Sequence, residues 1–274
     1  MVANIQPPNV SRQFDSDQPA AGYGQVRRPG DLLRVFSLTR QGKKEGKTMA
    51  KAQTKGIEIP AITIGRATIR VEGTTDLVVH KFAEKARREM LDKQQLKATK
   101  KKEAKNPAAD YRGAMYILDG DPEDDQSDDD VWEPISSAEC SAKHGFPAAA
   151  FRLAMIRGVK ACGGVMTDAR TAFNIEAVNN LVPIEFAGVR CVEDVVRLNG
   201  KSADLRHRPY YSGWSATLPV MFNASLMSID QIVNVLRLAG MSVGVGEWRP
   251  EKNGSFGTFV IDPESLKTVS YEEL

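Results

Sequence analysis

The chain has 274 residues, of which 37 are basic and 35 acidic, and its formal net charge is +2. No stretch reaches the ~18–20 apolar residues of a membrane span, and no apolar segment of a secretory signal lies near the start, so we expect a cytoplasmic protein without a membrane partner. The cysteines Cys140, Cys162 and Cys191 are too few and too scattered for a disulfide scaffold or a zinc site, so we predict no metal and no cofactor.

Charge is distributed in blocks along the chain. Residues 1–56 carry a net charge of +6, residues 57–118 of +5 and residues 119–133 of −9, whereas the remainder is neutral. Residues 1–56 have too little apolar surface to offset the entropy of ordering, which predicts a disordered leader, with Met49 as an alternative start. The other interpretation of this leader is a functional basic arm.

A second irregular region spans residues 96–143 and interrupts a core domain that we place at residues 57–262. Its part 119–133 holds nine acidic residues and no basic one. Because like charges repel, we expect a solvated, charged insertion, with a nucleic-acid mimic and a self-inhibitory flap as functional alternatives. We expect residues 263–274 to form a frayed tail.

Within the core, alternation of apolar and polar residues indicates strands, and apolar residues three and four apart indicate helices. Helix starts are marked by a capping box of Ser228 and Gln231, by Pro147 and by a possible cap at Asp76. In chain order we predict a strand at 62–73, helices at 77–91 and 148–160, strands at 171–175, 181–184, 194–198 and 214–222, a helix at 228–239, and strands at 241–245 and 254–261. This order favours an α+β fold, namely a ferredoxin-like or RRM-like mixed antiparallel sheet with helices on one face and a long charged insertion.

Residues 244–257 are rich in glycine, and we call them the Gly-rich loop. The loop follows a helix and precedes a strand, which excludes a Rossmann fingerprint, and it lacks the Lys-Ser/Thr of a P-loop. The glycines permit a partner to approach closely, and the side chains of Trp248 and Arg249 can stack on bases or pair with phosphate. The alternative is a hairpin that turns at residues 253 and 254. The candidate glycines are Gly244, Gly246, Gly254 and Gly257.

Basic and aromatic residues are interleaved in residues 201–214. This composition is typical of surfaces that bind single strands, because cations pair with phosphates and rings stack on bases. The alternative is a cationic strand edge with half-buried rings. The candidate binding residues here are Arg206, Arg208, Tyr210, Tyr211 and Trp214.

A third basic cluster, with Arg152 and Arg157, follows the helix start at residue 147. Free N–H groups at a helix start can bind a phosphate, and a solvated helix face is the alternative. Catalytic signals are few, since none of the three histidines, His80, His144 and His207, has a metal-ligand neighbour at helical or turn spacing. A lone histidine that acts as a general base in RNA cleavage is the enzymatic alternative.

Three segments resemble the RAMP superfamily, the crRNA-binding backbone proteins of CRISPR effector complexes. Residues 71–80 resemble the family's first strand and the turn after it, and residues 146–157 are similar to its helix start that lies along bound RNA. The helix at 228–239 and the Gly-rich loop resemble the family's C-terminal helix and glycine-rich loop. The resemblance implies an RRM-like fold, binding of RNA or another single strand, side-by-side oligomers, and a phage- or prophage-encoded relative.

Together these patterns predict a non-catalytic protein that binds single-stranded nucleic acid, RNA rather than DNA, and forms homo-oligomers. The alternative is a phage assembly or host-interaction protein that acts through contacts with a host or phage protein. A metal-independent endoribonuclease is the weaker alternative.

Overall fold

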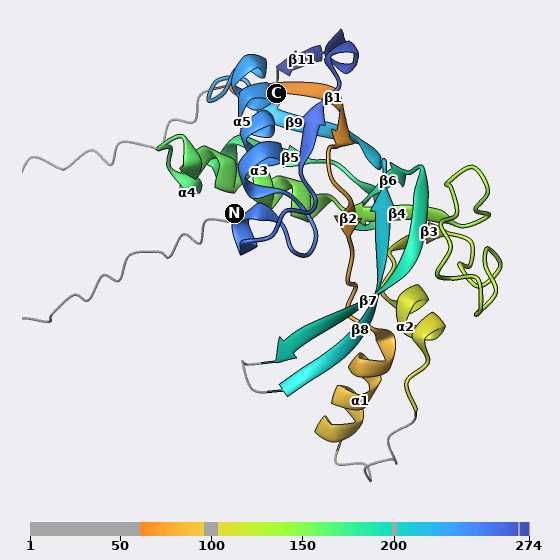
Figure 1. The fold of residues 1–274 in the computed structure, drawn as a ribbon. Helices are drawn as coiled ribbons and strands as arrows, with labels where there is room; N and C mark the ends of the chain where they lie inside the picture. Colours follow the sequence, from red (N-terminus) through yellow and green to blue (C-terminus); the bar gives the residue numbers. More distant parts are fainter. Residues whose placement is uncertain (1–60, 96–103, 199–201, 268, 274) are drawn as a thin grey trace, which may run out of the picture. The chain divides into compact units, whose positions relative to one another are not determined.

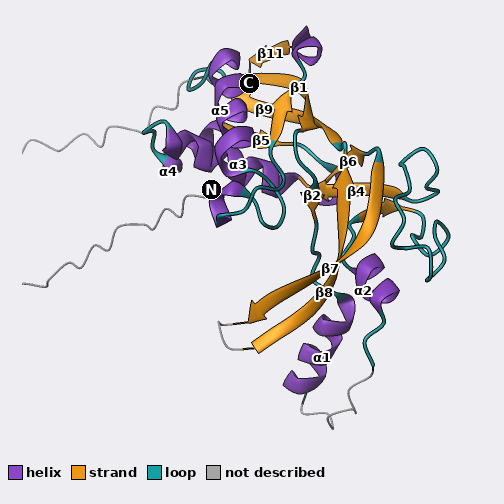
Figure 2. Cartoon of the chain, in the orientation of Figure 1, coloured by secondary structure: helices purple, strands orange, loops and turns teal. Residues whose placement is uncertain are grey.

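A computed structural model describes residues 61–95, 104–198, 202–267 and 269–273 (Figures 1 and 2). The predicted leader and its alternative start at Met49 lie outside the described residues. Five α-helices and two sheets are present in the described part of the chain, so the fold class is α+β.

The larger sheet has eight strands, in the order β10-β1-β9-β6-β4-β3, with β11 also beside β1 and β5 also beside β9. Its described pairings are antiparallel, and the longest joins β1 to β9 from Ile64↔Asn223 to Glu72↔Ser215. The strands are β1 (Thr63–Gly73), β3 (Ile117–Asp119), β4 (Lys143–Pro147), β5 (Phe173–Ile175), β6 (Leu181–Glu185), β9 (Ser215–Asn223), β10 (Phe259–Ile261) and β11 (Val269–Glu273).

One face of the larger sheet is buried because alternate residues of β1, such as Ile69, are apolar. Helices α3 and α5 add Phe151 and Leu236 to the same core cluster. The two helices approach closely at Gly158, where a Cβ would lie 3.0 Å from the carbonyl oxygen of Val235. The helices are α1 (Glu84–Gln94), α2 (Pro107–Gly113), α3 (Ala148–Ala161), α4 (Met166–Ala172) and α5 (Ile229–Leu238).

The opposite face of β1 is open and carries paired charges. The guanidinium group of Arg66 lies 2.6 Å from the carboxylate of Glu272 and 3.7 Å from that of Glu176. Arg70 lies 3.0 Å from the carboxylate of Glu185. Acidic partners therefore offset the cations of this face.

A second sheet contains β2 (Leu77–Val78), β8 (Ser202–Ser212) and β7 (Gly188–Leu198), with β8 in the centre. We call β7 and β8 the long hairpin; it projects beside α1 and α2 in Figure 1. The sequence predicts only residues 194–198 of it as strand. Residues 207–211 of β8 are all buried, because the strand is paired on both edges and α2 packs against it, so no alternation of apolar and polar residues marks it.

The predicted helix at 77–91 is confirmed only in its second half, because residues 77–83 are not helical. Residues 77 and 78 form β2, where Leu77 and Val78 are fully buried against β8, and α1 begins only at Glu84 without a side-chain cap. Asp76, the expected cap, instead accepts a hydrogen bond at its carbonyl oxygen from the N–H of Gly257, 2.8 Å away.

Residues 241–245 do not form the predicted strand, and the strand predicted at 254–261 is shorter than expected. Ala239–Val243 continue α5 as a π-helix, which ends at Gly244 with φ +70°, and only β10 forms from the second segment. Gly240 directly follows the predicted helix at 228–239, where we expected the helix to end. It lies inside the π-helix, where a Cβ would come within 2.0 Å of the carbonyl oxygen of Phe259. A glycine here lets the helix touch β10 rather than end.

The charged insertion is more ordered than predicted in its described part. It contains α2 and β3, and it buries Tyr111 and Val131 to 1% and 0% exposure. The expected frayed tail forms β11, which pairs with β1 from Ala67↔Val269 to Thr63↔Glu273. Every helix in the described residues is too short or too polar to span a membrane.

Candidate functional site

Strand β2 holds the Gly-rich loop against the long hairpin. On one side β2 pairs with β8, and the N–H of Val79 donates to the carbonyl oxygen of Pro209 at 3.1 Å. On the other side the carbonyl oxygen of Val78 accepts from the N–H of Glu247 at 2.8 Å. Two clusters that are separate in the sequence, residues 201–214 and the Gly-rich loop, therefore become neighbours.

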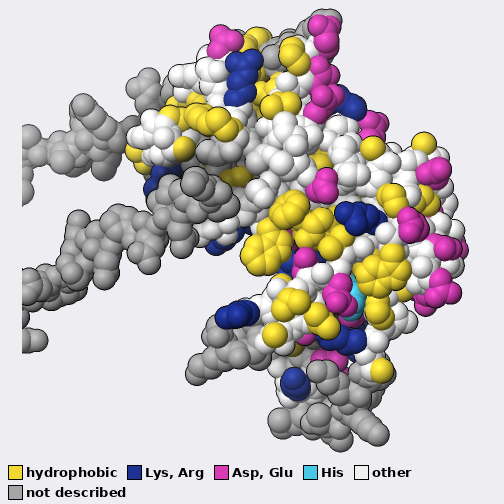
Figure 3. All heavy atoms as spheres, viewed as in Figure 1, with side chains coloured by type: hydrophobic (Ala, Val, Ile, Leu, Met, Phe, Trp, Pro, Cys, Tyr) yellow, Lys and Arg dark blue, Asp and Glu magenta, His cyan; other side chains and the backbone are white. Residues whose placement is uncertain are grey.

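A pocket of about 160 Å³ lies between the Gly-rich loop and α3. Its lining includes His80 after β2, the first turn of α3 and Arg157 further along that helix, together with Glu247 and Arg249 of the loop. Figure 3 shows hydrophobic side chains gathered over the Gly-rich loop and the base of the long hairpin, with basic and acidic side chains beside them. The pocket therefore combines apolar walls with charged groups.

Two arginines at the pocket share one carboxylate. The Nε of Arg249 lies 3.0 Å from the carboxylate of Glu251, and Arg157 pairs with the same group. Arg249 also donates to the carbonyl oxygen of Gly246 at 2.8 Å. The two arginines and Glu251 together carry a net charge of +1, whereas the carboxylate of Glu247 on the pocket wall opposes an anion.

Trp248 has an unusual backbone conformation. Its φ is +52°, in the left-handed region that bulky residues rarely adopt, and 42% of its surface is exposed. The N–H of Phe256 donates to its carbonyl oxygen at 3.0 Å. Folding of the loop onto itself therefore holds Trp248 in a strained conformation that leaves part of its indole in solvent.

The loop's own folding explains its glycines. Gly244, Gly246 and Gly257 have φ between +67° and +79°, and a Cβ at Gly257 would lie 1.8 Å from the carbonyl oxygen of Val245. A Cβ at Gly254 would lie 1.7 Å from the carbonyl oxygen of Trp248. These glycines are required by contacts within the protein, so their presence alone does not indicate a partner.

The rings of Tyr211 and Trp214 lie in the core, with 0% and 1% exposure. The indole N–H of Trp214 donates to the carbonyl oxygen of Thr75 at 2.8 Å, and the hydroxyl of Tyr211 lies 2.9 Å from Nδ1 of His144. A ring without exposed surface cannot stack on a base. The predicted stacking role of these two residues is therefore wrong.

Three other candidates lie on β8 and differ in accessibility. Arg208 is 2% exposed and pairs with Asp194 at 3.4 Å, so it cannot reach a phosphate. The hydroxyl of Tyr210 also bonds to Asp194, at 2.9 Å, and its ring packs edge-on against Phe256 of the Gly-rich loop. Of the three, only Arg206 keeps part of its side chain in solvent; its Nε lies 3.6 Å from the carboxylate of the half-buried Asp204.

Arg152 is a structural residue. Its guanidinium group donates to the carbonyl oxygens of Phe173 at 3.2 Å and Arg170 at 2.6 Å, which ties α3 to the end of α4. Of the predicted site residues, the structure brings the following to the pocket wall: Arg157, Gly244, Gly246 and Arg249.

The three histidines differ in access. His144 and His207 are 4% and 5% exposed, so only His80 reaches the pocket. Burial, and then the cations of Arg208 and Arg206, lower the pKa of His80. The neutral form of its ring is therefore favoured. The sequence placed this residue on a predicted helix, so its position at the pocket was missed.

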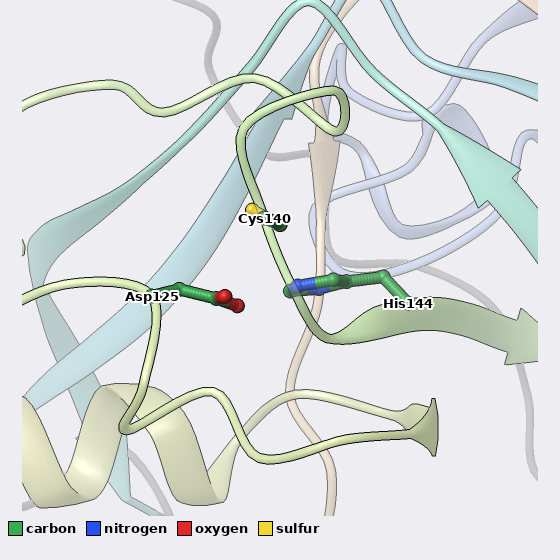
Figure 4. Close-up of side chains that lie close together, drawn as sticks. All are labelled: Asp125, Cys140 and His144. Atoms are coloured by element: carbon green, nitrogen blue, oxygen red, sulfur yellow. The ribbon is translucent and has the colours of Figure 1, made fainter.

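A group of potential metal ligands lies on the insertion side of the molecule. Ligand atoms of Asp125, Cys140 and His144 all lie within 4.8 Å of one another (Figure 4), a grouping that the sequence did not predict. Cys140 and His144 are four residues apart, so the inference that no histidine has a metal-ligand neighbour at helical spacing is wrong for His144. Asp125 belongs to the acidic residues 119–133, which we call the acidic block, and no sequence pattern around it indicates a metal ligand.

No family model matches this sequence, and no curated protein does. The resemblance of α3 and the Gly-rich loop to the RAMP superfamily therefore stays an expectation from the sequence.

Proposed function

We propose that the chain is a non-catalytic, RAMP-like protein that binds single-stranded nucleic acid, RNA rather than DNA, at the Gly-rich loop and its pocket. The conformation of Trp248 carries this proposal. Backbone strain persists only where surrounding contacts impose it, and it gathers at binding sites. Here the hydrogen bond from Phe256 and the close packing of Gly254 impose it, and the result is a partly exposed ring on a fixed backbone.

Three cations belong to the same loop as this indole or to its pocket. Arg249 follows Trp248 in sequence, Lys252 is exposed on the same loop, and Arg157 reaches the pocket from α3. Stacking of one base on an aromatic ring contributes ~1–3 kcal/mol, and cations add contacts to phosphates that weaken as salt rises. An exposed ring with cations on the same loop therefore suits a flexible polyanion with unpaired bases.

The open face of the larger sheet is a poorer candidate. Many RRM domains stack bases on rings of that face. Here β1 presents Arg66, Thr68 and Glu72 on it, and its cations are paired with carboxylates. We therefore place the contact at the loop rather than on the sheet.

The order of the strands supports the ferredoxin-like part of the proposal. Strands β10-β1-β9-β6 are neighbours in the sheet, and α3 follows β1 along the chain whereas α5 follows β9. Two strand–helix–strand units interleaved in this way are the arrangement of a βαββαβ fold. The long hairpin, β2 and the charged insertion are then additions to it.

A titration with labelled oligonucleotides tests the proposal. Full-length chain is added to single-stranded RNA, single-stranded DNA and duplex RNA of one length, and fluorescence anisotropy is recorded at several salt concentrations. We expect the tightest binding to single-stranded RNA and an affinity that falls steeply with salt. Absence of salt-sensitive binding to either single strand would refute the proposal.

A second candidate function, contact with another protein copy or with a host or phage protein, is favoured by α1. No residue of this helix is buried. Met90 and Leu91 on the helix and Phe82 just before it are apolar and 50–60% exposed. Exposed apolar side chains of this size are typical of interaction surfaces. Light scattering with and without oligonucleotide distinguishes the two functions, because a discrete assembly that ignores the oligonucleotide favours protein contacts.

A further inference from the structure

Three side chains with different ligand atoms converge near the start of β4. Asp125 comes from the acidic block after β3, Cys140 from the loop before β4, and His144 from β4 itself. Figure 4 shows the carboxylate of Asp125 and the imidazole of His144 facing each other, with the sulfur of Cys140 beside them. An oxygen, a sulfur and a nitrogen are therefore gathered within 4.8 Å although the residues span twenty positions of the chain.

Two buried polar atoms of this group have no hydrogen-bond partner among the described residues. His144 is 4% exposed, and both its Nε2 and Oδ2 of Asp125 are buried without a partner among the described residues. A buried polar atom that stays unpaired is destabilising, so it calls for an explanation such as an ion.

The opposite atoms of the same side chains are well held. Nδ1 of His144 lies 2.9 Å from the hydroxyl of Tyr211. Oδ1 of Asp125 accepts from the N–H and the hydroxyl of Ser141 at 2.5 and 2.7 Å and from the N–H of Ala142 at 3.3 Å. Outer hydrogen bonds that orient a ligand and leave its inner atom free are a regular feature of metal sites.

We propose that Asp125 Oδ2, Cys140 Sγ and His144 Nε2 bind one Zn²⁺ ion, with water as the fourth ligand. A thiolate, an imidazole and a carboxylate in one small site suit tetrahedral zinc. The charges of the thiolate and the carboxylate balance those of the ion, and no Lys or Arg of the described residues forms a salt bridge with Asp125.

The ion ties the acidic block to the body of the fold. Zinc bonds of 2.0–2.3 Å place neighbouring ligand atoms about 3.5 Å apart, so the three atoms must close by up to about 1 Å. Asp125 and Cys140 are half-buried loop residues and can make this movement, whereas His144 is fixed in its strand. The site therefore adds a link between β4 and a segment whose like charges repel one another.

A Cys–His nucleophile is the competing explanation of the cluster. Burial, and then the charge of Asp125, raise the pKa of the Cys140 thiol to about 12. A protonated thiol is a poor nucleophile, which disfavours the Cys–His explanation.

Metal binding to the tag-free full-length chain tests the site. After chelation, we expect the chain to take up one Zn²⁺, and Co²⁺ in its place to give a thiolate charge-transfer band in the near-ultraviolet. Cys140→Ser removes that band and weakens binding at least about tenfold, whereas Cys162→Ser, at the exposed cysteine, changes neither. Absence of stoichiometric uptake, a Co²⁺ spectrum without the band, or equal binding by Cys140→Ser would overturn the proposal.

A second measurement keeps the test decisive if Cys140→Ser does not fold. The wild-type chain is alkylated with and without Zn²⁺, and its cysteine peptides are quantified by mass spectrometry. We expect the ion to protect Cys140 and to leave Cys162 reactive. Equal alkylation of Cys140 in both conditions would contradict the site.

Discussion

The long hairpin and the Gly-rich loop have similar compositions and opposite exposures. Both contain arginines next to aromatic residues, yet Tyr211 of the hairpin is 0% exposed and Trp248 of the loop is 42% exposed. Strand β8 is paired on both edges, by β7 and β2, and α2 packs against it, so the Tyr211 ring is enclosed. The loop also contacts β2 and β8, but the left-handed conformation of Trp248 leaves this residue partly in solvent. Composition alone therefore does not separate a core from a binding surface.

The largest expected effect on stability lies at Trp214, in the turn between β8 and β9. Trp214→Ala removes a ring that is 1% exposed and hydrogen-bonded, so we expect a loss of about 3–5 kcal/mol in the free energy of unfolding. Urea denaturation followed by circular dichroism measures it. If the free energy of unfolding falls no more than it does for a substitution at an exposed position, the Trp214 ring is not part of the core.

Next in size is the conformation of the Gly-rich loop. Gly257→Ala introduces a Cβ that would clash with the carbonyl oxygen of Val245 at a φ of +67°, so we expect a loss of about 1–3 kcal/mol and weaker oligonucleotide binding. Gly113→Ala is the matched control, because nothing lies within 4 Å of its Cβ. Equal behaviour of the two variants in denaturation would mean that the loop tolerates rearrangement.

The strain at Trp248 gives a smaller effect of opposite sign. Trp248→Gly relieves a positive φ, so we expect stability to rise by up to about 1 kcal/mol while oligonucleotide binding is lost. Trp132→Gly, at an equally exposed residue outside the left-handed region, is expected to lower stability instead. A decrease for both variants in thermal denaturation would remove the argument from strain.

The smallest expected effect concerns salt dependence. Arg249→Gln removes one cation of the proposed contact, so the slope of log affinity against log salt is expected to fall by about 0.7 for a single strand. Arg66→Gln on the open sheet face is the control and is expected to leave the slope unchanged. Anisotropy titrations of both variants check this, and a change for Arg66→Gln alone would move the contact to the sheet.

Locally encoded parts of the fold could be predicted from the sequence. The capping box of Ser228 and Gln231 is confirmed at the start of α5, and α3 begins directly after Pro147 as expected. The strand predicted at 62–73 is confirmed as β1. These signals are contained within a few consecutive residues, so no tertiary contact is needed to interpret them.

The remainder depends on contacts between distant residues. The helix predicted at 77–91 relies on the spacing of apolar residues between 79 and 90, but pairing with β8 buries Leu77 and Val78 as a strand. The burial of Tyr211 and the approach of Asp125 to His144 likewise depend on segments far apart in the sequence. Such contacts have no local pattern, so the burial of these rings and the approach of Asp125 to His144 could not be predicted.

The affinity of Trp248→Ala for single-stranded RNA, compared with that of Trp132→Ala, tests the central claim most directly. The two tryptophans are equally exposed, at 42%, and the control lies in the acidic block. We predict that Trp248→Ala weakens binding by about 5–150-fold, equivalent to loss of one stacked base, and that Trp132→Ala binds as the wild type does. Equal affinities of the two variants would contradict the proposed contact at the Gly-rich loop.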